Sequence, residues 1–162
     1  MKLSSPIGPI KLHATYCGLQ SVTFIDESAE QLEPASNTGD HPLEQKTAKL
    51  LGAYFEGEFK TAFNLELPLY LRGTAFQVMV WNALLRIPYG DKISYQEFAA
   101  SFGAANAVRA VGAAIGKNPL PIIIPCHRVI RSSGRIEGYK WGSVRKSALI
   151  GWEGVKKGSG GG

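Results

Sequence analysis

Residues 94–116 read SYQEFAASFGAANAVRAVGAAIG. Ser94 followed by Glu97 is the pattern of a capping box, which predicts a short helix that begins there and ends before Gly103. Gly103 marks a turn, and a second helix is expected over about residues 106–115. A short helix, a glycine turn and a second helix form the outline of a helix-turn-helix. That outline alone also fits helix pairs in proteins that bind no DNA.

The residues before this stretch predict another helix and, nearer the N-terminus, a small sheet. Thr74 and Gln77 form a second capping-box pattern, followed by apolar residues at helical spacing as far as Ile87. Towards the N-terminus, turn signals separate short β-type runs, and the elements expected there are strands over 2–4, 9–15 and 19–25, a loop over 26–40, a helix over 41–55 and an extended link over 63–69.

These elements predict two domains. We expect an α/β domain over residues 1–72, with a small antiparallel sheet and a helix. A mostly helical domain with the helix-turn-helix follows over 73–155. The glycine-rich residues 156–162 are expected to form a flexible tail without fold information.

Downstream of the helix-turn-helix, residues 121–130 read PIIIPCHRVI. The isoleucines at 122–124 predict a buried strand, and a last helix is expected from Ser143 to Ile150. Cys126 follows that strand, beside a histidine and an arginine. A thiol pKa falls next to such groups and rises in apolar surroundings, so a reaction at sulfur is one interpretation. The ordinary alternative is a buried cysteine that only packs as a small apolar side chain.

His127 is the nearest candidate base for Cys126. Adjacent residues of an extended strand point to opposite faces, so His127 reaches the sulfur only if the strand has ended, or through a water. A Cys–His pair also needs a third group to orient the imidazole. Glu153, near the end of the last helix, is a candidate, although a single glutamate is usually a solvated carboxylate.

The composition limits the class of protein. The chain has 162 residues, 44% of them hydrophobic, and two cysteines, Cys17 and Cys126, which form neither a disulfide framework nor a zinc-type spacing. No apolar run is long enough to span a membrane and no signal-peptide core is visible, so we expect a reducing intracellular compartment. Residues 1–72 have a net charge of −3 and residues 73–162 a net charge of +8. This asymmetry favours a polyanionic partner, most simply nucleic acid, over a merely basic surface.

A set of short motifs then resembles the O6-alkylguanine-DNA alkyltransferases, also called methylated-DNA–protein-cysteine methyltransferases. The matching segments, in the family's order, are Gly73–Gln77, Val80-Trp81, Ile87–Gly90, Ser94-Tyr95, Arg109–Gly112, Asn118-Pro119, Ile124–Ile130, Gly138-Tyr139, Arg145-Lys146 and Glu153-Gly154. The resemblance covers nearly all of residues 73–155 and is weaker over 1–72. It implies a ribonuclease-H-like first domain and a winged-helix-like second domain.

The resemblance also implies a function and roles for residues. The family transfers an alkyl group from O6 of guanine in DNA, with O4 of thymine as a further candidate substrate, irreversibly to a cysteine. Cys126 resembles that acceptor, His127 the base acting through a water, and Glu153 the carboxylate that orients it. Asn118 resembles the residue linking the helix-turn-helix to the active site, and Tyr95 the donor to the departing guanine, whose protonation lowers the barrier.

DNA recognition follows from the same resemblance. The target nucleotide must leave the base stack to be reached, and Arg109 resembles the side chain that fills the vacated space. Small residues of the second helix suit the minor groove, although they also mark close helix packing. The expected DNA-binding residues are Arg109, Tyr95, Ala107, Ala110, Arg128, Arg131 and Ser132. The expected pocket residues are Tyr139, Trp141, Lys146 and Val129.

Two features depart from the family pattern. Lys140-Trp141-Gly142 stands where a small residue and two glycines are commoner, so we expect Trp141 to crowd the pocket mouth and to hinder bulky free bases such as benzylguanine. His13, Cys17 and His41 do not reproduce the zinc ligands of some relatives, so no metal and no cofactor is expected.

Three other functions compete with alkyl transfer. A non-catalytic protein that binds alkylated DNA and signals is the main alternative, but such relatives lack the cysteine. A thiol hydrolase would leave the basic half without a purpose, and a transcription regulator would need a further domain. We therefore expect a monomer in the cytoplasm, associated with the nucleoid (or nuclear in a eukaryote), that binds double-stranded DNA and needs no membrane or protein partner.

Overall fold

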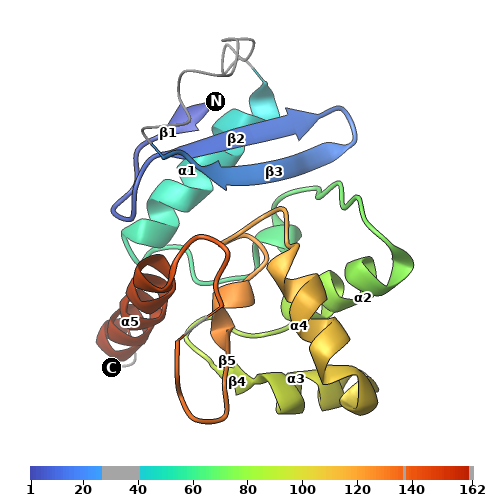
Figure 1. The fold of residues 1–162 in the computed structure, drawn as a ribbon. Helices are drawn as coiled ribbons and strands as arrows, with labels where there is room; N and C mark the ends of the chain where they lie inside the picture. The colour runs from blue at the N-terminus through green and yellow to red at the C-terminus, as the bar shows by residue number, and fades with distance from the viewer. Residues whose placement is uncertain (27–40, 137, 161–162) are drawn as a thin grey trace. The chain divides into compact units, whose positions relative to one another are not determined.

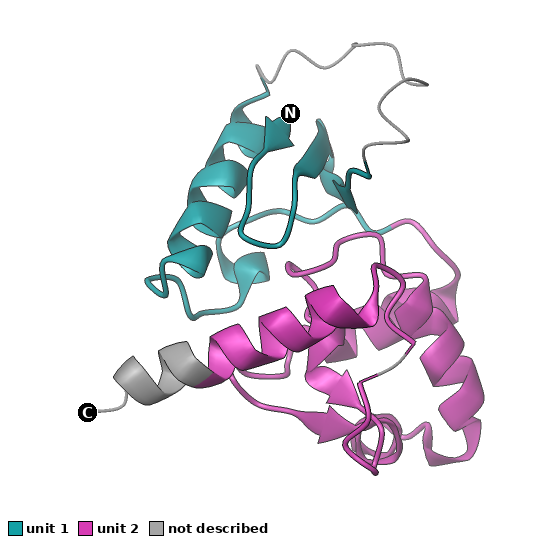
Figure 2. Ribbon diagram, turned by 60° about the vertical axis from the view of Figure 1, so that its left-hand side comes forward, with its two compact units in different colours: residues 1–71 teal, residues 72–162 magenta. Residues whose placement is uncertain are grey.

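The computed structural model describes residues 1–26, 41–136 and 138–160, with side chains as far as residue 154 in the last helix. The chain divides into two compact units, Met1–Leu71 and Arg72–Gly162 (Figure 2). The loop expected over residues 26–40 lies outside the described residues except for Asp26. None of the helices in the described ranges is long and apolar enough to cross a membrane.

The first unit is a small sheet with one helix on it (Figure 1). The strands lie antiparallel in the order β1-β2-β3, and alternate residues of β2 are buried, which is the pattern of a half-buried strand. The elements of this unit are β1 (Lys2–Leu3), β2 (Ile10–Thr15), β3 (Gly18–Phe24), α1 (Pro42–Phe55) and a 3-10 turn, η1 (Phe63–Leu65).

The link over residues 63–69 differs from the expected extended segment, and it packs closely against Gly18. The link expected to be extended over 63–69 begins with η1, and only Leu69 forms a strand-like bridge, to Leu19. Gly18, at the start of β3, has φ +144, and a Cβ there would lie 2.8 Å from the carbonyl oxygen of Pro68. Glycine is therefore required where this link crosses the hairpin.

The second unit is mostly helical and contains the expected helix-turn-helix. Both capping-box hydrogen bonds form at the first helix, between Thr74 and Gln77 (3.1 and 3.0 Å). At the second pattern, Ser94 Oγ accepts from the N–H of Glu97 (3.1 Å). The elements are α2 (Ala75–Leu84), β4 (Ile93–Ser94), α3 (Tyr95–Ser101), η2 (Ala105–Ala107), α4 (Val108–Gly116), η3 (Cys126–Arg128), β5 (Val129–Ile130) and α5 (Ser143–Gly160).

Two contacts fix the helix-turn-helix within this unit. Gly103 provides the left-handed turn between α3 and α4, with φ +84. The indole Nε1 of Trp81 in α2 donates to the carbonyl of Ala114 in α4 (2.8 Å), at a buried site. Strands β4 and β5 pair in parallel, so the start of α3 lies directly beside the segment that follows Cys126.

Two expected elements of the second unit are wrong in detail. Residues 122–124 are buried as predicted, but they form consecutive turns and not a strand, with Ile122 at φ +72. The last helix begins at Ser143 as predicted but continues beyond Ile150 to Gly160, through part of the expected tail. Glu153 therefore lies inside α5 and not near its end.

Candidate active site

Cys126 begins η3 directly after Pro125, and its residue is 5% exposed. Its backbone N–H donates to the carbonyl of Ile124 (2.7 Å), which closes the last of the preceding turns. Because Cys126 and His127 lie in a helical turn, the alternation of side chains expected for a strand does not apply to them.

The sulfur of Cys126 lies between groups with opposing effects. Burial raises the pKa of the Cys126 thiol, while a hydrogen bond from the Asn118 side chain and the charge of Lys146 lower it; burial outweighs both. The resting group is therefore a thiol. A reaction at sulfur then requires a nearby base, while Asn118 and Lys146 stabilise the thiolate that forms.

The candidate base is His127, which is fully buried. Its Nε2 lies 2.7 Å from Oε1 of Glu153 in α5. Hydrogen bonds and charges of His127 and Arg128 outweigh the effect of burial on Glu153 and hold its pKa well below the usual range. Because the carboxylate is ionised, Nε2 carries the hydrogen and Nδ1 is the acceptor. Among the described residues, Nδ1 of His127 has no hydrogen-bond partner.

Asn118 connects the end of the helix-turn-helix to the segment of the cysteine. Its Nδ2 donates to the carbonyl of Ile124, and its Oδ1 accepts from the N–H of Leu120, both at 2.9 Å and buried. These two bonds hold the turns that deliver Cys126. The side chain thus links the end of α4 to the segment that carries Cys126.

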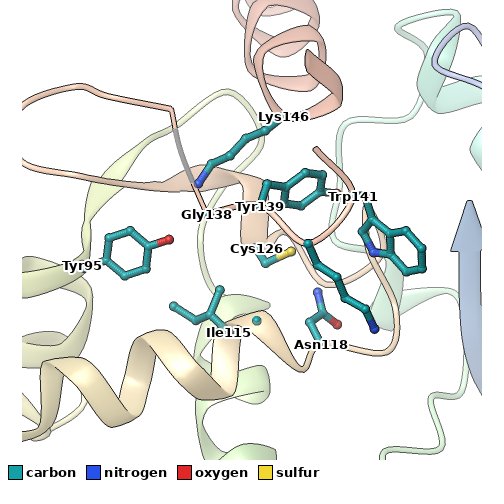
Figure 3. A pocket seen from close by; sticks show the side chains of 10 residues that line it. Tyr95, Ile115, Asn118, Cys126, Gly138, Tyr139, Trp141 and Lys146 are labelled. Carbon is teal, nitrogen blue, oxygen red and sulfur yellow. The ribbon is translucent and has the colours of Figure 1, made fainter. Parts of the chain in front are cut away.

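A pocket opens around the sulfur (Figure 3). The hydroxyl of Tyr95 points towards Cys126 from one side, and Tyr139 and Trp141 lie on the other. The cavity volume is about 10 Å³, roughly the space of one water molecule. A purine base enters only if the pocket widens. The lining residues are Tyr95, Ile115, Gly116, Asn118, Cys126, Gly138, Tyr139, Lys140, Trp141 and Lys146.

The expected pocket residues have distinct surroundings. The Tyr139 hydroxyl is buried and has no hydrogen-bond partner in the described part of the chain. Nζ of Lys146 donates to the carbonyl of Val129 (2.7 Å). Val129 is buried and does not line the pocket itself. The ring of Trp141 lies 4.9 Å from Nζ of Lys140, at the distance of a cation–π contact.

Most of the expected DNA-binding residues lie on the surface of the second unit. Arg109 and Ala110 of α4 are exposed, and Ala107, just before α4, is half-buried. Arg131 and Ser132 are exposed after β5, where Ser132 Oγ donates to Oε1 of Gln96 (2.7 Å). The surface of α4 near Arg109 is thus formed by small side chains, which permits close approach of a partner.

The structure corrects the role expected for Arg128. We expect it among the DNA-binding residues from the sequence, but it is 6% exposed and its guanidinium is paired inside the unit. Its Nε and Nη2 donate to Glu153 (3.0 and 2.9 Å), and its Nη1 donates to the carbonyl of Ile87 (2.7 Å). The available signal was its place within an apolar run, because a buried arginine requires a buried acceptor.

The site contains no arrangement typical of a metal centre. In the ranges that the structure describes, no group of three or more His, Cys, Asp or Glu side chains is placed to hold an ion. The groups gathered at the site are a thiol, an imidazole–carboxylate pair, two tyrosine hydroxyls and a buried lysine.

Comparisons with known proteins agree on both units. The family model "6-O-methylguanine DNA methyltransferase, ribonuclease-like domain" matches residues 2–69, and the corresponding "DNA binding domain" matches residues 75–155. A methylated-DNA–protein-cysteine methyltransferase of Mycobacterium tuberculosis is 45% identical over 150 residues, covering 91% of this chain and 87% of that protein. One of Methanosarcina barkeri is 41% identical over 148 residues, covering 91% and 92%.

Solved structures give the same result. The crystal structure of Mycobacterium tuberculosis OGT in complex with DNA superposes with a TM-score of 0.81 and 42% sequence identity, covering 96% of this chain and 92% of that one. The expected fold class, a small α/β domain followed by a mostly helical one, is thereby confirmed.

Proposed function

The chain belongs to the 6-O-methylguanine DNA methyltransferase family, and on that premise we propose that it repairs DNA by transferring an alkyl group from O6 of guanine to Cys126. The observation that carries this proposal is the juxtaposition in one pocket of a buried thiol with Tyr95, Tyr139 and Lys146, backed by the His127–Glu153 pair. The protein is thus a methyltransferase that acts once, because the thioether formed is not reversed.

The transfer is an in-line displacement. Sγ of Cys126 attacks the alkyl carbon, a carbon–sulfur bond forms, and the bond from that carbon to O6 breaks with its electrons passing to the guanine ring. The thiol proton passes through a water to Nδ1 of His127, whose Nε2 already donates to Glu153 (2.7 Å). This geometry supports the role of a base acting through a water.

The departing guanine requires a proton at its ring. Burial, followed by the charge that Cys126 carries as a thiolate, raises the pKa of the Tyr95 hydroxyl, so it stays protonated and can donate a hydrogen bond to the ring. Tyr139 supplies a wall of the base pocket. Asn118 and Lys146 both lower the pKa of Cys126 and so favour the thiolate.

DNA binding belongs to the second unit in this proposal. Helix α4 enters the minor groove, with Ala107 and Ala110 allowing close approach and Arg109 filling the space of the rotated nucleotide. Arg131 and Ser132 contact the backbone. Contacts of this kind use little base readout, so the affinity should fall steeply with salt.

The domain organisation and location follow the same reasoning. Residues 1–72 and 73–155 act as an N-terminal domain and as the DNA-binding, alkyl-transfer domain. We infer a cytoplasmic, nucleoid-associated monomer that takes double-stranded DNA containing O6-alkylguanine as its partner, without a cofactor. O4 of thymine is a second candidate substrate.

The test is the site and stoichiometry of the transfer. The protein is incubated with a duplex that contains one O6-methylguanine, digested, and its peptides are weighed. We expect one methyl mass per protein, on the peptide containing Cys126. Cys17→Ser is the matched control and should transfer normally, whereas Cys126→Ser should not. Intact Cys126 on protein that binds the duplex would instead favour the signalling alternative, and several turnovers per protein would exclude single use.

A further inference from the structure

Arg128 is hydrogen-bonded to Glu153, the carboxylate partner of the candidate base His127. Its guanidinium donates to Glu153 in α5 through Nε (3.0 Å) and Nη2 (2.9 Å), and to the carbonyl of Ile87 through Nη1 (2.7 Å). Its Cζ lies 5.7 Å from the ring centroid of Tyr89. Arg128, the last residue of η3, therefore connects this turn to α5 and to the loop after α2.

Glu153 in turn accepts hydrogen bonds from three residues. His127 Nε2 approaches Oε1 at 2.7 Å, Arg128 forms a two-pronged pair, and the N–H of Gly90 donates to Oε2 (3.2 Å). The guanidinium is always charged, so Glu153 and Arg128 together have no net charge. His127 thus faces a neutralised carboxylate and not a free anion.

We propose that Arg128 is a positioning residue for alkyl transfer, which neutralises and orients Glu153 so that His127 stays uncharged at rest with Nδ1 free to take the thiol proton. The proposal rests on the proposed function, since it names how that reaction keeps its base ready. It gives Arg128 a role inside the site, in place of contact with DNA.

Several ionisable groups surround His127 and set its charge. Burial lowers the pKa of His127; the hydrogen bond and charge of Glu153 raise it, and the charges of Arg128 and Lys146 lower it. Tyr89 and Cys126 are the other ionisable groups at this place, and both have a raised pKa, so they are neutral at pH 7. Without Arg128, the unbalanced carboxylate would convert His127 into an imidazolium, which cannot accept a proton.

The experiment compares Arg128→Met with the unchanged protein. The chain has three histidines, so ¹⁵N-histidine spectra resolve the protonation state of His127 as pH is varied. We expect neutral His127 at pH 7 in the unchanged protein and an imidazolium in Arg128→Met, a rise in its pKa of at least about two units. This readout does not depend on alkyl transfer, so it stays informative even if the proposed function fails.

The rate of methyl transfer gives the second readout. The ratio of the Arg128→Met rate to the unchanged rate should be about one tenth at pH 7 and should recover towards one by pH 9, because each unit changes the neutral fraction about tenfold. Arg128→Lys keeps the positive charge but loses the paired hydrogen bonds of the guanidinium to Glu153. The ratio of its transfer rate to the unchanged rate should therefore be reduced equally at every pH. Arg86→Met, which removes an exposed arginine, is the matched control and should show no pH-dependent loss.

Two results would overturn the proposal. One is a folded Arg128→Met protein whose His127 stays neutral at pH 7, and the other is a rate loss of the same size at all pH values. If Arg128→Met does not fold, the double variant Arg128→Met, Glu153→Gln removes the unpaired carboxylate and is measured in its place. His127 must then remain neutral at pH 7, and an imidazolium in that variant would refute the charge argument.

Discussion

At the scale of single residues, Asn118 supports backbone that belongs to no helix or strand. Replacing it with alanine leaves the N–H of Leu120 buried without a partner, whereas the carbonyl of Ile124 loses one hydrogen bond but still accepts from the N–H of Cys126. A buried group without a partner costs about 1–3 kcal/mol, so we expect Asn118→Ala to lose about 1–3 kcal/mol of unfolding free energy in urea. Asn82→Ala, an exposed position of α2, is the control and should change stability by less than about 0.5 kcal/mol. Equal urea midpoints for both variants would contradict the role given to Asn118.

Trp141 allows a second prediction at this scale. Its ring lines the pocket and is held near Lys140, while its carbonyl accepts from Nη1 of Arg145 (3.2 Å). Because the cavity is small, we expect Trp141→Gly to react at least about tenfold faster with free benzylguanine, as a bulky side chain no longer blocks the mouth. The rate is measured as loss of methyl-transfer capacity over time. Comparable inactivation of the two proteins would show that Trp141 does not restrict entry.

The sequence was sufficient to propose Cys126, His127 and Glu153 as a group but not to distinguish the arginine beside them. The group came from residue chemistry and from a resemblance. The structure pairs His127 with Glu153 and places Cys126 in the adjoining pocket, next to His127 in η3. Arg128 was expected among the DNA contacts with the other residues taken from the resemblance, whereas the structure buries it. Its true partner lies 25 residues away on α5, and a single chain does not reveal which carboxylate a buried cation selects.

At the scale of elements, α4 presents an exposed face of small side chains beside Arg109. We expect Ala110→Leu to weaken duplex binding about tenfold or more without loss of stability, because the added side chain opposes close entry into a groove about 6 Å wide. Fluorescence anisotropy with a labelled duplex measures the affinity. The control is the rate with free benzylguanine, which needs no groove and should be unchanged. Unaltered duplex affinity would place the DNA elsewhere on the unit.

Helices were predicted better than the segment that carries the sulfur. Capping residues mark the starts of α2 and α3, and glycines mark the ends of α3 and α4, so these limits could be predicted from neighbouring residues. The run at 122–124 is apolar throughout and fits a buried strand or a buried turn equally. Turns are favoured by the prolines at 119, 121 and 125. The left-handed backbone of Ile122, at φ +72, is held by tertiary packing and cannot be predicted from neighbouring residues.

At the scale of the whole molecule, the tryptophans report on one unit alone. All three, Trp81, Trp141 and Trp152, lie in Arg72–Gly162. Tryptophan fluorescence therefore follows the unfolding of the second unit separately from the first, which matters because two units need not unfold together.

That signal tests a pH dependence. In the folded state the pKa of His127 lies below 6.5 through burial, and that of Glu153 well below 4.5 through His127 and Arg128, which outweigh its burial. The unfolded chain therefore binds more protons as the pH falls, first below about 6.5 and then below about 4.5. We expect the second unit to lose about 2 kcal/mol or more of stability between pH 7 and pH 3.

The matched variants for this prediction are Glu153→Gln and Glu97→Gln. In a plot of unfolding free energy against pH, Glu153→Gln should reduce the slope below about pH 4.5. Glu97→Gln changes an exposed residue of α3 to another good capping residue and should leave the curve unaltered. A Glu153→Gln curve as steep as that of the unchanged protein would show that this carboxylate does not govern acid stability.

The two cysteines differ most in access. Cys17 is exposed in the β2–β3 turn, whereas Cys126 is buried in the small pocket and its thiol pKa is raised by that burial. A maleimide added to the folded protein at neutral pH should therefore label Cys17 at least about a hundredfold faster than Cys126, as peptide masses would show. In urea, the two rates should converge. Equal rates in the folded protein would mean that the pocket is open most of the time.

The depth of Cys126 has a consequence for how long an unused molecule remains competent. A turnover enzyme regenerates its nucleophile, but a protein that reacts once loses its whole capacity if a peroxide or disulfide reaches the sulfur first. Oxidation follows thiolate character and exposure, and here the exposed thiol at Cys17 lies far from the chemistry in sequence. Burial therefore protects Cys126 from oxidation before it reacts. The time for which the unreacted protein stays competent depends on how rarely its pocket opens.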